Sequence, residues 1–176
     1  MINILGVGLL RNGTKHFIVL KKSAGILVFR IREKKPEIFL MHPGGPYWAK
    51  KDLGAWSIPK GEIGENEDEE EAARREFEEE TGIQLNGELI PLKPIKQKTG
   101  KTVIAWAVEQ DIDVSNIKSN QFEMEWPPHS RKYQQFPEMD RAEWFSVSDA
   151  KEKIIPGQAA LIAELEEILK SRLLQY

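Results

Sequence analysis

Cysteine is absent from the 176 residues of this chain. Its absence excludes disulfide bonds, thiolate catalysis and zinc sites with cysteine ligands. A reducing compartment is then the simpler assumption, so we expect a cytoplasmic protein. A strong charge of one sign is missing too, because 25 basic side chains stand against 28 acidic ones and the formal net charge is only -3. We therefore expect no general binding to nucleic acid.

Long apolar runs are also missing. The opening stretch, Met1 to Leu10, is apolar but too short to cross a bilayer, and it has neither the basic start nor the small-residue cleavage site of a secretory signal. We therefore expect folded structure there and no membrane contact. The length and the 40% hydrophobic content fit one compact domain with a proper core. Composition gives no indication of the oligomeric state.

Several apolar runs separated by turn residues predict strands. The Asn12-Gly13 pair between two apolar runs predicts a β-hairpin within residues 1–22. Residues 24–31 and 37–41 are rich in Ile, Leu, Val and Phe, which predicts two central strands. The following residues, 42–46, hold two prolines and two glycines, so we expect a loop there instead of a longer strand.

A second hairpin is predicted by the runs 89–98 and 101–109, which flank Thr99-Gly100. Its second run is apolar on both faces, which indicates burial on both sides. Its first run contains Pro91 and Pro94, which cannot donate to a β-ladder. We therefore expect that run at a sheet edge.

Two segments predict helices. Residues 68–81 are dense in Glu, Ala and Arg, begin with Asp68 as a candidate N-cap and end at Gly82. Residues 158–174 carry apolar side chains at helical spacing, which indicates an amphipathic helix packed on a sheet. Together with the strands, these helices predict an α/β (α+β) fold in a single domain, with a mixed β-sheet sandwiched between helices.

The first of these helices carries the residues of chemical interest. Glu76, Glu79 and Glu80 stand at positions i, i+3 and i+4, so their carboxylates share one face of the helix. Carboxylates this close repel one another, and a bound magnesium ion, which prefers oxygen ligands, would relieve that repulsion. A helix rich in glutamate can also be a plain solvated surface.

The surrounding residues favour the metal site, because they match every fixed position of the Nudix box, G-x(5)-E-x(7)-R-E-U-x-E-E-x-G-U, with U a bulky apolar residue. The matching residues are Gly61, Glu67, Arg75, Glu76, Phe77, Glu79, Glu80, Gly82 and Ile83. The chain thus resembles the Nudix hydrolases, with a Nudix domain at 23–176 after an N-terminal extension at 1–22. Residues 56–61 resemble the W-x-x-P-K-G lead-in of dinucleoside polyphosphate and diphosphoinositol phosphate hydrolases. A longer resemblance, over roughly 23–165, is to bacterial-type predicted Nudix nucleoside triphosphate pyrophosphohydrolases whose substrates are unassigned.

The resemblance assigns a role to each box residue. It implies that Glu76, Glu79 and Glu80 are catalytic metal ligands for magnesium, with manganese as an alternative, and that the backbone carbonyl of Lys60 joins them. The residues with a structural role are Gly61, Glu67, Arg75 and Gly82, of which Glu67 and Arg75 pair with each other. Phe77, Ile83, Ala72 and Ala73 are expected to pack the helix against the sheet.

Residues outside the box are candidates for proton transfer and substrate binding. Glu138 is the candidate general base, because it precedes the strand at 142–145, where related hydrolases bring in a further carboxylate; Glu123 and Glu125 are alternatives. The candidate substrate-binding residues are Lys60, Arg30, His42, Trp48 and Lys98. Lys96 and Lys101 could also reach phosphates, and Tyr47 and Trp126 could stack on a nucleobase. Each of these residues has an ordinary alternative role in the surface or the core.

The resemblance implies magnesium-dependent hydrolysis of a pyrophosphate bond in a nucleoside diphosphate derivative. Residues 59–61 favour a dinucleoside polyphosphate, with a nucleoside triphosphate as the other main substrate. The alternatives are a diphosphoinositol phosphate, a capped RNA end, or a Nudix-fold nucleotide sensor that does not cleave its ligand. Sensors generally lose box carboxylates, whereas this chain keeps them all. The expected partner is a small phosphorylated molecule.

Overall fold

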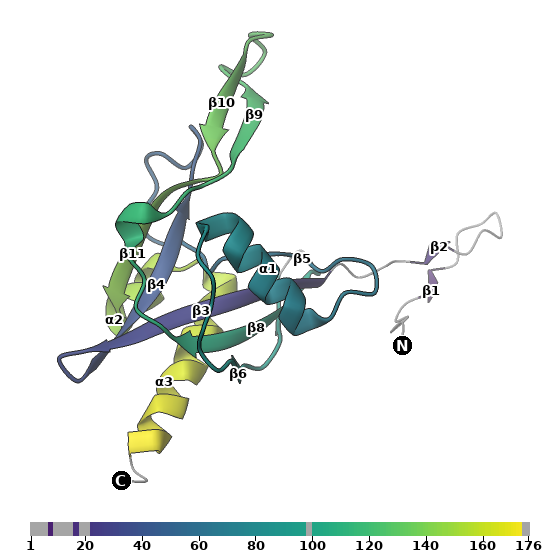
Figure 1. Ribbon diagram of the computed structural model, residues 1–176. Helices are drawn as coiled ribbons and strands as arrows, with labels where there is room; N and C mark the ends of the chain where they lie inside the picture. Colours follow the sequence, from purple (N-terminus) through teal and green to yellow (C-terminus); the bar gives the residue numbers. More distant parts are fainter. Residues whose placement is uncertain (1–6, 9–15, 18–21, 98–99, 174–176) are drawn as a thin grey trace.

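The fold is an open mixed sheet with helices on both faces (Figure 1). The structure is a computed structural model that describes residues 7–8, 16–17, 22–97 and 100–173. The strands are β1 Val7–Gly8, β2 His16–Phe17, β3 Lys22–Arg32, β4 Lys35–Pro43, β5 Lys60–Glu62, β6 Ile90–Pro91, β7 Ile95–Lys96, β8 Thr102–Glu109, β9 Gln121–Glu125, β10 Tyr133–Pro137 and β11 Met139–Ser146. The helices are α1 Glu69–Thr81, α2 Val147–Lys153 and α3 Ala159–Leu173, with short 3-10 helices η1 Val114–Asn116 and η2 Pro156–Gln158.

Strands β3 and β4 lie at the centre of the sheet, as their apolar composition predicts. The strand order is β11-β4-β3-β8-β6, with β5 paired to β3 and β7 paired to β8. Only β3 and β8 run parallel among the described pairs. The predicted run at 89–98 is reduced to β6 and β7 at the sheet edge, in keeping with the two prolines that it contains.

Helices cover both faces of this sheet and create two core layers (Figure 1). Along β3, Ile26 and Val28 face α1, whereas Leu27 and Phe29 face α2 and α3, because side chains of a strand alternate between faces. All four side chains are fully buried. The predicted sheet between helices is therefore confirmed.

Helix α1 begins and ends where the sequence predicts. Asp68 caps its first turn by accepting hydrogen bonds from the backbone N–H groups of Glu70 and Glu71, at 2.9 and 3.1 Å. Gly82 ends the helix in the left-handed region, with φ of 73°, and its N–H donates to the Glu78 carbonyl. The last helix, α3, covers residues 159–173 of the predicted 158–174.

Strand β4 is longer than predicted. His42 and Pro43 still belong to it, opposite Arg141 and Met139 of β11, so the expectation of a loop from residue 42 was wrong. A proline at the last position of a strand interrupts the ladder little, because the strand needs no further N–H donor there. The loop begins at Gly44.

The β9/β10 hairpin, the short strand β5 and helix α2 were not predicted. The hairpin projects beyond the sheet (Figure 1). At the other end of the chain, β1 pairs antiparallel with β2, but the predicted Asn12-Gly13 turn lies outside the described residues. The assignment of residues 1–22 to an extension therefore stays a prediction. No helix in the described part of the chain is long and apolar enough to cross a membrane.

Candidate active site

Strand β5 brings the loop of the box directly against α1. It pairs with the start of β3, with Lys60 opposite Gly25. A Cβ atom on Gly61 would lie 1.7 Å from Oε2 of Glu76, and one on Gly25 would lie 2.9 Å from the Pro59 carbonyl oxygen. Only glycine leaves room for the close backbone approach at Gly25, and a side chain at Gly61 would displace the Glu76 carboxylate, so both glycines help to place β5 on the carboxylate face of α1.

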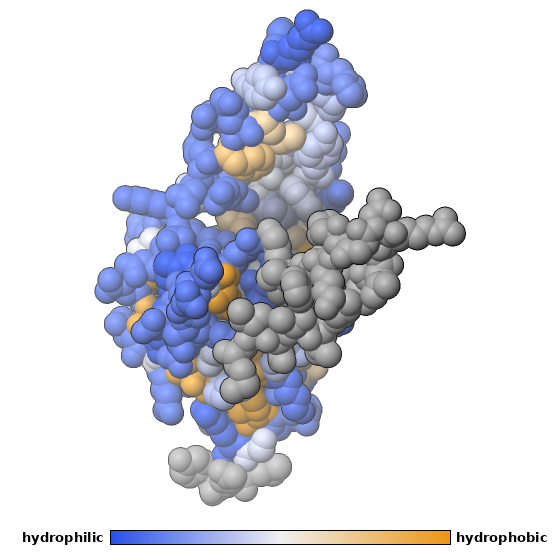
Figure 2. All heavy atoms as spheres, turned by 90° about the vertical axis from the view of Figure 1, so that its right-hand side faces the viewer, coloured by the Kyte–Doolittle hydropathy of each residue, from blue (hydrophilic) through white to orange (hydrophobic). Residues whose placement is uncertain are grey.

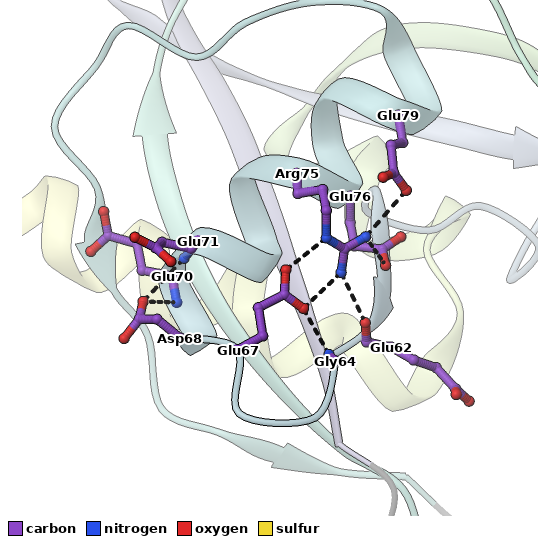
Figure 3. A network of polar contacts seen from close by, with 9 residues as sticks. All are labelled: Glu62, Gly64, Glu67, Asp68, Glu70, Glu71, Arg75, Glu76 and Glu79. Atoms are coloured by element: carbon purple, nitrogen blue, oxygen red, sulfur yellow. Dashed lines mark hydrogen bonds and ion pairs between the residues drawn. The ribbon is translucent and has the colours of Figure 1, made fainter.

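Arg75 ties the loop to the helix (Figure 3). Its guanidinium donates to both carboxylate oxygens of Glu67, at 2.7 and 2.9 Å, and to the backbone carbonyl of Glu62 at 3.2 Å. The Gly64 N–H donates to the same carboxylate at 2.7 Å. The Arg75 guanidinium, helped by this N–H, lowers the pKa of Glu67 from 4.5 to about 2. The structure thus brings Glu67 and Arg75 together as the sequence implies.

This ion pair predicts an acid-dependent difference in stability. Because folding lowers the pKa of Glu67, its contribution is complete above pH 4.5 and is lost as the pH falls toward 2. We expect Glu67→Gln to melt at a lower temperature than the wild type at pH 7, and the gap to close between pH 4.5 and 2. Thermal melts across this pH range measure the gap. Glu65→Gln, an exposed change in the same loop, is the control, and a gap independent of pH would contradict the prediction.

Two of the three candidate metal ligands also contact Arg75. Its Nη1 donates to Glu76 at 2.8 Å and to Glu79 at 3.2 Å (Figure 3). The Glu76 side chain is only 14% exposed, whereas that of Glu79 is 54% exposed. The guanidinium therefore offsets the repulsion between neighbouring carboxylates of the helix.

Glu80, the third candidate ligand, points to β5. Its carboxylate accepts the backbone N–H of Lys60 at 3.0 Å, an interaction that fixes the strand on the helix. The pKa of Glu80 is raised to about 7, mainly by burial; the charges of Glu76 and Glu138 add to the rise, and Lys60 opposes it. Negative charge from two segments of the chain, α1 and the turn before β11, thus gathers around this carboxylate.

The donor set at this place suits a hard divalent cation. It consists of carboxylate oxygens that repel each other, and such a cation would lower their mutual repulsion. Among residues 22–97 and 100–173, no three carboxylate or imidazole groups already converge as a metal-binding group. Arg75 accounts for this, because it holds Glu76 and Glu79. The Glu79 side chain is 54% exposed, so it is free to change rotamer.

Comparison with known proteins identifies this arrangement. The NUDIX domain profile matches residues 19–165 of the chain. The chain belongs to the NUDIX domain family. It is 33% identical over 106 residues to the asymmetrical bis(5'-nucleosyl)-tetraphosphatase of Rattus norvegicus, which covers 53% of this chain and 68% of that enzyme. A short match, 58% identical over 33 residues, is to the RNA pyrophosphohydrolase of Erythrobacter litoralis (strain HTCC2594) and spans 19% of this chain and a fifth (20%) of that protein.

Solved structures share the Nudix fold. A binary complex of the C. elegans Ap4A hydrolase superposes with a TM-score of 0.58 at 22% identity, covering 86% of this chain and 98% of that one. The NUDIX domain of Shewanella oneidensis NrtR with ADP ribose gives 0.60 at 15% identity, over 87% and 90% of the two chains. At these identities the likeness shows the fold, and the predicted fold class is confirmed. Family and box together make the chain a Nudix-type pyrophosphohydrolase of nucleotide derivatives.

Glu138 lies beside the Nudix box although 58 positions separate it from Glu80. It stands between β10 and β11, and its N–H donates to the Asn120 carbonyl at 2.8 Å. The Asn120 side chain in turn reaches the Glu79 carbonyl at 3.5 Å. Glu123 and Glu125, the alternative candidates for the general base, lie on the projecting hairpin.

Arg30 and His42, which were predicted to bind substrate, have their contacts away from the Nudix carboxylates. Arg30, near the far end of β3 from β5, is paired with Glu37 and Asp111 at 2.6 and 2.7 Å. The His42 ring is fully buried, with its nitrogens 2.6 Å from Asp140 and 2.8 Å from the Lys51 carbonyl. Both side chains join segments of the fold, and their role in substrate binding stays a prediction.

The other predicted binding residues lie in different environments. Trp48 packs against the core layer of α2 and α3, with Lys51 over its ring at 4.5 Å. Lys98 lies outside the described residues. Lys96 is exposed at the sheet edge. Lys101 reaches the box loop, with its Nζ 3.3 Å from Glu62.

A cavity beside the Nudix helix was not predicted from the sequence. It has a volume of about 270 Å³ and lies between the start of β11 and the segment 114–119. The same segment contacts the end of α1, where the Lys118 N–H meets the Thr81 carbonyl at 3.4 Å. Val114, Ile117 and Met139 give the cavity apolar walls, and Asp140, Arg141 and Glu143 add charged groups. Its residues come from two segments, 114–119 and 139–143, that lie apart in the sequence, so only folding brings them together.

Proposed function

We propose that this Nudix hydrolase cleaves, with magnesium, a pyrophosphate bond in a dinucleoside polyphosphate or a nucleoside triphosphate. The observation that carries the proposal is the contact of β5 with α1, which gathers Glu76 and Glu80 at Lys60 and leaves Glu138 beside them. The rat relative's name, a bis(5'-nucleosyl)-tetraphosphatase, supports a substrate with two nucleosides.

The proposed ligands of the magnesium ion are Glu76, Glu79, Glu80 and the Lys60 backbone carbonyl, with manganese as the alternative ion. When bound, the ion supplies neutralisation of phosphate oxygens and activation of water. Arg75 supports these ligands, because it holds Glu76 and, through Glu67, the box loop.

Outside the metal ligands, the proposed general base is Glu138. Its carboxylate is exposed and close enough to Glu80 to affect the ionisation of that group, so it can take a proton from water and release it to solvent. The side chain of Lys60, half-buried beside Glu80, is proposed to contact a phosphate oxygen.

A second candidate substrate is the 5' end of an RNA. The observation that favours it is the 58% identity to an RNA pyrophosphohydrolase over 33 residues. More basic side chains around the site would be expected for this substrate, because an RNA presents many phosphates.

Product analysis on a substrate panel tests the proposal. Purified protein with Mg²⁺ is given diadenosine tetraphosphate, ATP, ADP-ribose, a diphosphoinositol phosphate and a 5'-triphosphorylated RNA, and products are separated by chromatography. We expect magnesium-dependent cleavage of diadenosine tetraphosphate or ATP, and none by Glu79→Gln. Cleavage of the RNA alone would favour the second candidate. Binding without turnover of any compound would indicate a nucleotide sensor and contradict the proposal.

A further inference from the structure

The β9/β10 hairpin has one apolar face. In its register, Phe122 stands opposite Phe136 and Met124 opposite Gln134, so these side chains share a face. Trp126 continues the same face two residues further along the chain. Its backbone N–H donates to the Lys132 carbonyl at 2.8 Å, which extends the pairing of the two strands. Figure 2 shows a small group of apolar side chains part-way along this projecting end, surrounded by hydrophilic residues. The hairpin therefore presents a narrow apolar strip.

The loop after β4 lies against this strip. A Cβ atom on Gly45, whose φ is +86°, would lie 3.1 Å from the Phe122 ring and 4.0 Å from Cβ of Phe136. One on Gly44 would lie 2.0 Å from the Pro137 carbonyl oxygen. The two glycines allow the loop to pack tightly on the base of the hairpin, so loop and hairpin form one unit.

Two aromatic rings end this contact and form an open corner. Tyr47 of the loop meets Trp126 of the hairpin with ring centroids 5.3 Å apart and planes at 82°. Tyr47 is 56% exposed. Phe122 and Phe136, nearer the base of the hairpin, already pack against the loop at Gly45. The exposed Tyr47 ring is therefore not needed to hold the loop on the hairpin.

The loop that carries Tyr47 begins beside Glu138. The Gly44 N–H donates to the Glu138 carbonyl at 2.8 Å, and Tyr47 follows three residues later. Three peptide units span at most about 11 Å, so the Tyr47 backbone lies within roughly 15 Å of the Glu138 carbonyl. A nucleotide with its phosphates near Glu80 and Glu138 can therefore extend its base toward the corner.

We propose that Tyr47 and Trp126 form a stacking site for a nucleobase of the substrate. The proposal rests on the proposed function, which places the phosphates at the Nudix box. Two rings at a right angle offer a flat face and an edge, which suit a planar base. A protein partner fits less well, because stable protein interfaces need a far larger area than this narrow strip offers.

Binding of two matched, non-hydrolysable probes tests the stacking site. α,β-Methylene-ADP carries a base, and methylenediphosphonate keeps only the linked phosphorus groups. With Mg²⁺ and calorimetric titration, we expect Tyr47→Ala and Trp126→Ala to weaken binding of the nucleotide by about 5- to 100-fold. Binding of methylenediphosphonate should stay within about twofold, and Tyr47→Phe should restore nucleotide binding. Tyr133→Ala is the matched control, because Tyr133 is 66% exposed on the opposite face of the hairpin.

Three outcomes would overturn the inference. The first is unchanged nucleotide binding in both alanine variants, and the second is an equal loss for both probes, which would show a structural role for the corner. In either case the wild type still binds methylenediphosphonate, so the proposed function survives. Failure of both probes to bind the wild type would contradict the phosphate site itself, and the stacking site with it.

Discussion

Glu80→Gln is expected to lose activity by more than about 100-fold without unfolding the protein, because replacing mere supporting partners of metal ligands already costs 10- to 100-fold. Glu80 is the candidate ligand that contacts β5, through the Lys60 N–H at 3.0 Å. A glutamine fills the same volume, and its amide oxygen can accept the same N–H. It lacks the negative charge that a divalent cation requires. The kcat/KM for diadenosine tetraphosphate, measured over a range of Mg²⁺ concentrations, gives the loss.

The control for this variant is Glu78→Gln. Glu78 lies on the same helix but is exposed, and its side chain contacts only Gln84 among the described hydrogen bonds. Its replacement should leave kcat/KM within about twofold and the melting temperature nearly unchanged. Full activity in Glu80→Gln would remove this residue from the catalytic site. A large fall in its melting temperature would show that the Lys60 contact serves the fold first.

Phe77→Ala is expected to cost about 3–5 kcal/mol of stability, because it leaves a cavity in the core layer beneath α1. The Phe77 ring is fully buried and packs with Ala24, Ile26, Val28, Phe39 and Met41. For a domain of this size, each kcal/mol corresponds to roughly 2–4 °C, so the melting temperature should fall by about 6–20 °C. Calorimetry on metal-free protein measures this fall.

Glu78→Ala controls for the change of helix residue. It places the same side chain at the neighbouring, exposed position, so its effect should stay within about 0.5 kcal/mol. Equal melting temperatures for the two variants would mean that Phe77 does not anchor α1. Because α1 carries Glu76, Glu79 and Glu80, loss of this anchor is also expected to weaken magnesium binding.

Helix α1 was predicted almost residue by residue because its determinants are local. The cap at Asp68, the left-handed end at Gly82 and the spacing of the glutamates all act within a few residues. Strands β3 and β4 were predictable for a similar reason, since a continuous apolar run has few other places in a small fold. The β9/β10 hairpin was missed, because its apolar strip is short and its turn lacks a favoured two-residue pair.

The surroundings of the candidate binding residues outside the box could not be predicted from the sequence. Arg30 and His42 are chemically able to hold phosphate, but their partners, Asp111 and Asp140, come from distant strands and loops. Burial and pairing of a charged group depend on which segments meet it in space, and the type of the residue does not reveal them. Glu138 was found only through family resemblance, and the structure places it beside the box.

By itself, the sequence determined the Nudix box, the ends of its helix, the apolar strands and the family, because each depends on residue types at fixed short spacings. Tertiary structure alone decided which carboxylates face one another, which cations are already paired, and that Tyr47 meets Trp126. The physical reason is distance: local rules act over one or two turns of chain, whereas these contacts join residues far apart in sequence through packing of the sheet, its helices and the projecting hairpin.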